Sequence, residues 1–201
     1  MKKPLSMVFA LSGLFLLTGC PSDGGSGGVN ITLGGSSAPA IAYVANQGTN
    51  DISAYTFNST TGVLTAVTGA PFSAGTSPSS VAVSSNGSFV YVANSGANTL
   101  SGFTVNSTTG ALAAVAGSPF AAGTTPSAVT VSPNNAFAFV ANQGTNNVSA
   151  YSINSSTGVL SGVAGSPFAA GTNPAAVAVS PNSSFAYVAN GGGDVCDCGS
   201  A

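Results

Sequence analysis

A four-residue motif that returns with a constant 48-residue period constrains this chain more than any other feature. It stands at Tyr43–Asn46, Tyr91–Asn94, Phe139–Asn142 and Tyr187–Asn190, where only the first residue varies between Tyr and Phe. Other residues keep the same spacing from cassette to cassette: Thr61-Gly62, Pro71-Phe72, Gly75 and Pro78 with their counterparts. A fixed period of this length indicates a repeat architecture, in which each unit packs against its neighbours.

Each 48-residue cassette shows the pattern of four short strands. In the second cassette, Ser80–Ser84 alternates polar and apolar residues, whereas Phe89–Ala93 is apolar on both faces and must be covered from two sides. The two remaining strands are predicted at Leu100–Val105 and Ala111–Val115, and Gly117–Gly123 leads to the next cassette. No sustained helical period follows Cys20, so the sequence predicts an all-β fold.

Four antiparallel strands per repeat fit a blade of a β-propeller. Val81–Gly87, Tyr91–Asn94 and Asn98–Ser101 resemble the YVTN-type propeller repeat, which is shared with lactonase-like propellers. The resemblance covers about Ala40 to Asn190. It implies the propeller fold, and it implies either sugar-lactone hydrolysis or a cell-surface role without assigned activity.

The repeat region is too short for the roughly seven blades that this resemblance implies. It begins near the second strand of one blade and ends after the second strand of another, which predicts three, four, four and two strands. We therefore expect an incomplete propeller of three to four blades at residues 40–190 and an irregular tail at 191–201. A truncated gene product, or a fragment of a longer propeller, remains an alternative.

The pattern of residues 1–39 predicts a segment for export and membrane anchoring. Lys2-Lys3 and the apolar run Leu5–Leu17 form a signal peptide at residues 1–19, and Leu17–Cys20 is similar to a bacterial lipobox. The resemblance implies lipidation of Cys20 with acyl chains such as palmitate, and a Gly/Ser-rich tether follows at residues 20–39. An ordinary cleaved signal is the alternative. We expect a lipid-anchored protein of the cell envelope, in the outer membrane if the source is Gram-negative, because Pro21 rather than Asp follows the Cys.

The charged residues exclude several functions. The only basic residues are Lys2 and Lys3, so binding to nucleic acid is not expected. The chain has no His, Glu or Arg, and Asp51 is the sole carboxylate of the repeat region, where Thr99 and Asn147 are its counterparts. Since general acid–base catalysis needs such groups, we predict no catalytic residue, and likewise no cofactor or metal site.

Two sets of polar residues allow more than one interpretation. Cys196 and Cys198 cannot complete a zinc site alone, which leaves exposed thiols in a tail or an intermolecular disulfide. The four Asn residues that end the motif fit turn-capping roles, and the alternative is a ring that binds a glycan or an ion. They are Asn46, Asn94, Asn142 and Asn190.

The sequence therefore favours a non-enzymatic, lipid-anchored propeller that binds protein or polysaccharide at the cell envelope. The alternative is a lactonase-like hydrolase of the 6-phosphogluconolactonase type. The incomplete circle also predicts self-association through exposed blade faces that lack charge. Two chains joined head to tail would approximate a six-bladed ring with one surplus strand at each junction, provided the rotations close.

Overall fold

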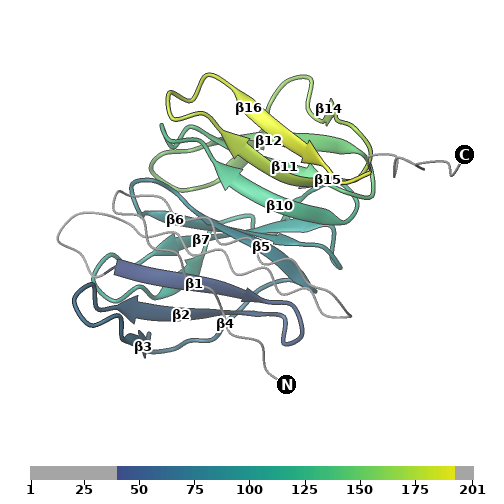
Figure 1. Cartoon of the computed structure of the whole chain (residues 1–201). Helices are drawn as coiled ribbons and strands as arrows, with labels where there is room; N and C mark the ends of the chain where they lie inside the picture. Colours follow the sequence, from purple (N-terminus) through teal and green to yellow (C-terminus); the bar gives the residue numbers. More distant parts are fainter. Residues whose placement is uncertain (1–39, 193–201) are drawn as a thin grey trace, which may run out of the picture.

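The computed structural model describes residues 40–192, which contain strands and turns and no helix. The strands form four antiparallel sheets that are stacked along the chain, with β1 towards one end of the stack and β16 at the other (Figure 1). This arrangement confirms the predicted all-β fold and is that of a partial β-propeller.

The four sheets are the blades A to D. Blade A contains β1 (Ala40–Asn46), β2 (Asp51–Phe57), β3 (Leu64–Ala66) and β4 (Phe72–Ser73). Blade B contains β5 (Pro78–Val83), β6 (Phe89–Asn94), β7 (Thr99–Val105), β8 (Leu112–Ala114) and β9 (Phe120–Ala121). Blade C contains β10 (Pro126–Val131), β11 (Phe137–Asn142), β12 (Asn147–Ile153), β13 (Leu160–Gly162) and β14 (Phe168–Ala169). Blade D contains β15 (Pro174–Val179) and β16 (Ala186–Asn190).

Strand order follows chain order within each blade. In blade B the order is β5-β6-β7-β8, and β1 of blade A corresponds to β6 because Tyr43 pairs with Ala54 as Tyr91 pairs with Gly102. The principal strands therefore number three, four, four and two, as the sequence predicts. The interpretation of Gly117–Gly123 as a plain connection was incomplete, because β9 within it pairs with β7; β4 and β14 repeat this pairing with β2 and β12.

The core lies between the blades rather than inside any one of them. All six residues of β6 are buried, which confirms the prediction for the strand that is apolar on both faces. One hydrophobic cluster joins blade A to blade B through Ile41, Tyr43 and Phe103. A second joins blade B to blade C through Tyr91 and Val140. Each blade is thus stabilised mainly by its neighbours, as in other repeat proteins.

Hydrogen bonds add a regular connection at the junctions of blades B and C and of blades C and D. The first strand of blade C, β10, contacts the first strands of both neighbouring blades, β5 and β15. The Ser79 hydroxyl donates to the carbonyl oxygen of Pro126 at 2.7 Å, and Ser127 donates to that of Pro174 at 2.7 Å. The same contact is therefore repeated one cassette further along the chain, so the cassettes are alike in tertiary contacts as well as in sequence.

Three predictions lie outside the described residues: the signal peptide at residues 1–19, the tether that begins with Cys20, and the tail cysteines Cys196 and Cys198. Within residues 40–192, no helix is long and apolar enough to cross a membrane.

Candidate functional site

In blades B and C, the Asn at the end of the second strand ties that strand to its neighbours, and we call this set of bonds the clamp. Asn190, its counterpart in blade D, is exposed. Asn94 is 0% exposed; its Oδ1 accepts from the Gly75 N–H at 3.0 Å, and its Nδ2 donates to the Ser101 hydroxyl at 2.9 Å. Asn142 is also 0% exposed and makes the equivalent bonds to Gly123 at 3.1 Å and Ser149 at 2.9 Å. Both amides are committed to the fold, which favours a structural role over a glycan or ion site. That role differs from the predicted turn capping, because each Asn bonds a Gly N–H 19 residues away and a Ser on the neighbouring strand.

The glycine that meets this clamp leaves no room for a side chain. A Cβ added at Gly75 would lie 2.6 Å from the Asn94 amide, and one at Gly123 would lie 2.6 Å from that of Asn142. These close approaches account for the recurrence of this glycine in successive cassettes. The clamp ties the end of the second strand to the chain entering that blade.

A second Asn, beyond the clamp in each cassette, connects successive blades, and sequence reasoning did not identify it. The Oδ1 atoms of Asn50, Asn98 and Asn146 accept from the backbone N–H of Ser77, Thr125 and Asn173 at 2.7–2.8 Å. All three Asn residues have positive φ, a conformation that Asn adopts more readily than most residues. The 48-residue recurrence of these Asn residues is visible in the sequence. Their partners are not, because each partner lies 27 residues away along the chain.

Asp51 takes part in the clamp of blade A. Its Oδ1 accepts from the Asn46 Nδ2 at 2.7 Å, and Asn147 accepts from Asn142 in the same way at 2.8 Å. Thr99 occupies this position in blade B and accepts from Asn94 at 3.2 Å. Because neutral side chains serve equally well at this position, the geometry supports the interpretation of Asp51 as a loop variant.

The buried tyrosines are held in their neutral form. The Tyr43 hydroxyl donates to the Gly110 carbonyl and that of Tyr91 donates to the Gly158 carbonyl, each at 2.7 Å. Burial raises the pKa of both phenols far above the usual range. Burial also raises the pKa of Tyr151, whose hydroxyl donates to the Ala121 carbonyl. A phenol in this state is a poor general base at neutral pH.

Among residues 40–192, no cluster of three or more His, Cys, Asp or Glu side chains is arranged to hold a metal ion. The described surface offers hydroxyl groups, amides and apolar side chains. Such a surface can recognise neutral ligands by hydrogen bonding and apolar contact.

The repeated sequence that forms these blades matches a known family. The model of the lactonase family of seven-bladed β-propellers matches residues 36–167. The chain belongs to this lactonase family. No curated protein matches the chain.

Solved structures share the lactonase-family fold. A candidate 6-phosphogluconolactonase from Bacteroides fragilis is 20% identical, with a TM-score of 0.65 over 75% of this chain and 41% of its own. One from Bacteroides uniformis is 19% identical, with a TM-score of 0.65 over 81% of this chain and 44% of its own. A periplasmic gluconolactonase from Pseudomonas aeruginosa is 21% identical, with a TM-score of 0.55 over 66% of this chain and 37% of its own. The chain thus spans less than half the length of each of these lactonase-family structures.

Proposed function

We propose that this chain is a lipid-anchored β-propeller of the lactonase family that binds a protein or polysaccharide at the cell envelope without hydrolysing it. The proposal rests on one observation: the side chains that could take part in catalysis are hydrogen-bonded within the fold. Asp51 is hydrogen-bonded to Asn46, and the hydroxyls of Tyr43 and Tyr91 are bonded to backbone carbonyls. The two tyrosines join neighbouring blades and Asp51 joins two strands of blade A, so these groups are poorly placed to activate water.

Anchoring rests on the lipobox-like residues Leu17–Cys20. Several acyl chains on one Cys would hold the protein on a membrane, since each buried CH₂ contributes about 0.8 kcal/mol. Metabolic labelling with a fatty-acid analogue tests this part directly. We expect label on the wild-type chain and none on Cys20→Ala; equal labelling of both would refute the anchor.

Hydrolysis of a sugar lactone is the second candidate. Family membership and the lactonase-type names of the structural relatives support it more directly than they support a binding role. The side chains of this chain support the binding role instead. The two proposals differ in a measurable quantity, the rate of lactone opening.

The deciding experiment follows acid release from gluconolactone with the purified full chain. A binding module leaves the spontaneous rate unchanged. An enzyme accelerates it, and Asp51→Asn is the sharp control because Asn147 already occupies the equivalent position in blade C. Turnover that Asp51→Asn abolishes, with the melting temperature unchanged, would establish the hydrolase and overturn the binding proposal.

A further inference from the structure

Both complete blade junctions of this chain are built from the same two contacts. At the junction of blades A and B, Ile41 fills the space above Gly110, where an added Cβ would lie 2.8 Å from its side chain. At the junction of blades B and C, Phe89 lies above Gly158, where an added Cβ would lie 2.5 Å from its ring. The adjacent Tyr hydroxyl donates to the carbonyl of the same glycine each time.

The glycine belongs to a rigid turn between the third and fourth strands of a blade. Gly110 and Gly158 have φ values of 77° and 74°, and each N–H donates to the carbonyl of the Asn that opens the turn. That Asn also accepts two backbone N–H groups of the turn through its side chain. The turn therefore presents its glycine carbonyl in a fixed direction to the preceding blade.

Blade A carries the same turn, on which no residue of the described range 40–192 packs. Gly62 has a φ of 74°, and its N–H donates to the Asn58 carbonyl at 2.8 Å. A Cβ added at Gly62 would meet no atom within 4 Å, and Gly62 is exposed whereas Gly110 and Gly158 are buried. Leu64 beside it is 49% exposed, while its counterpart Leu160 is 7% exposed in the core between blades B and C.

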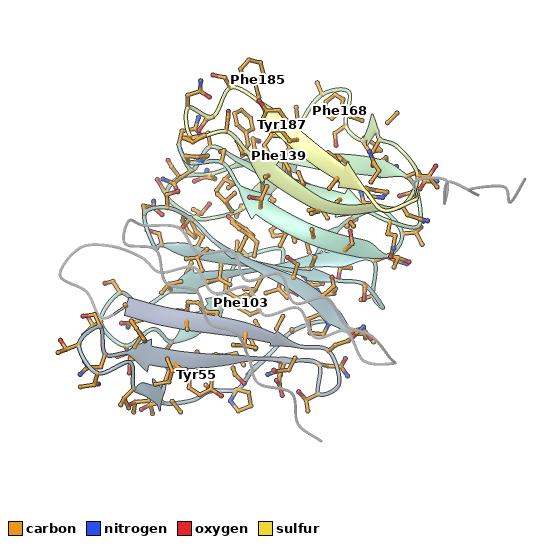
Figure 2. All side chains as sticks on the ribbon, in the orientation of Figure 1. Tyr55, Phe103, Phe139, Phe168, Phe185 and Tyr187 are labelled. Carbon is orange, nitrogen blue, oxygen red and sulfur yellow. The ribbon has the colours of Figure 1, made fainter. Side chains whose placement is uncertain are left out.

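Blade D carries the other half of the junction, which no part of the chain that the structure describes covers. Phe185 and Tyr187 hold the positions of Phe89 and Tyr91, with exposed fractions of 61% and 62% against 4% and 0%. Their rings are already arranged side by side, with centroids 6.4 Å apart. Figure 2 shows them at the blade D end of the molecule, with Tyr55 of blade A at the opposite end.

We propose that a second copy of this chain covers blade D by placing its blade A there. Phe185 then lies over Gly62 of the second copy, and the Tyr187 hydroxyl donates to the Gly62 carbonyl. The two internal junctions identify blade A as the partner of blade D. In both of them, the residues at the positions of Phe185 and Tyr187 pack on the glycine turn of the next blade. No charged residue is among the contacts that define either half, so neither desolvation of a charge nor like-charge repulsion opposes the union.

The proposed contact places one blade against another, and it keeps the head-to-tail orientation that the sequence predicts. It is also heterologous, because blade D of one copy meets blade A of the next. Such a contact leaves one face free at each end and continues into a closed ring or a filament.

Photo-crosslinking in cells that express the full chain tests the contact. A photoreactive phenylalanine derivative replaces Tyr187, and the matched control places it at the exposed Ser161 of blade C. We expect crosslinked dimers only from position 187, with the crosslink mapped to residues 58–64. A crosslink to another protein, to lipid or within one chain, or no crosslink at all, would overturn the proposal.

A pair of glycine substitutions provides the second arm. Gly62→Asn places a side chain where Phe185 must lie, whereas Gly87→Asn makes the same change at a φ of 70° with no atom within 4 Å. We expect Gly62→Asn to lower the dimer yield at least about tenfold, equivalent to roughly 1.4 kcal/mol, with no change for Gly87→Asn. Thermal melting of both variants monitors folding. Equal dimer yields from the two would contradict the assigned contact.

Discussion

The hydroxyl of Tyr91 in blade B donates a hydrogen bond of 2.7 Å to the carbonyl oxygen of Gly158 in blade C, 67 residues further along the chain. Tyr43 and Gly110 repeat this relationship at the same separation and distance. The bond is buried, and it joins the apolar core to the turn that caps the next blade. It therefore offers a direct measure of how strongly adjacent blades are coupled.

Tyr91→Phe should lower the free energy of unfolding by about 1–3 kcal/mol, because the Gly158 carbonyl would remain buried without its donor. Urea denaturation followed by circular dichroism measures the change. Tyr187→Phe in dilute protein is the matched control, since this hydroxyl belongs to an exposed residue. Equal losses in the two variants would show that the buried bond adds nothing.

Gly158→Ala should destabilise the chain more than Gly62→Ala, although both glycines have a φ of 74°. The backbone penalty is common to both, but only the methyl group at residue 158 collides with Phe89. Overpacking of this kind costs about 1–3 kcal/mol. The difference between the urea midpoints of the two variants measures the cost of the collision with Phe89. Equal midpoints would mean that the Phe89 ring moves aside without cost.

Asn94→Ala should cost about 1–3 kcal/mol, because the Gly75 N–H and the Ser101 hydroxyl lose a buried partner. Asp51→Asn should change stability by less than about 0.5 kcal/mol, since it reproduces the Asn142–Asn147 pair of blade C. Thermal melting compares the two. A larger effect at Asp51 would give that carboxylate a role that its counterparts lack.

Alkaline pH should destabilise the fold. The pKa values of Tyr43 and Tyr91 are raised in the folded state by burial, so above a pH of about 10 the unfolded chain loses phenolic protons that the folded chain keeps. The folded state then binds more protons, and the free energy of unfolding falls as pH rises. Stability is therefore complete below about pH 10 and declines above it.

Urea denaturation across this range measures that slope. The double variant Tyr43→Phe/Tyr91→Phe is less stable at neutral pH, but it should show a smaller decline above about pH 10 than the wild type. Parallel curves would assign the alkaline loss to other groups.

Much of this fold can be read from the sequence because two patterns coincide. Period-2 alternation marks the strand at Val81–Val83, and an unbroken apolar run marks Phe89–Ala93 as covered on both sides. The 48-residue spacing then repeats each assignment in the following cassettes. Local pattern and global packing agree at these positions, so the blades follow directly.

The polar contacts are harder to predict because their partners are distant in sequence. No residue near Asn94 in the sequence indicates that the Gly75 N–H donates to its side chain, because the two residues meet only after the blade has formed. The short strand β9 was missed for a related reason: Pro119 and Gly123 give Phe120–Ala121 the composition of a connection, and only pairing with β7 makes it a strand. The exposure of the Phe185 side chain is equally hard to predict from the sequence, because it depends on which residues pack against blade D.

The inter-blade bonds of this chain have consequences for how such a gene can change. Ser79 reaches Pro126 in the next cassette, as Ser127 reaches Pro174, and the tyrosine contacts advance in the same register. Removal or duplication of one whole 48-residue cassette therefore brings the same repeat positions together again at each new junction. An insertion of a single residue within β6 has no such solution, because it turns the following side chains to the opposite face. Recombination between cassettes can thus change the length of the protein while it preserves the pairing of repeat positions, whereas a one-residue insertion within a strand disrupts that pairing.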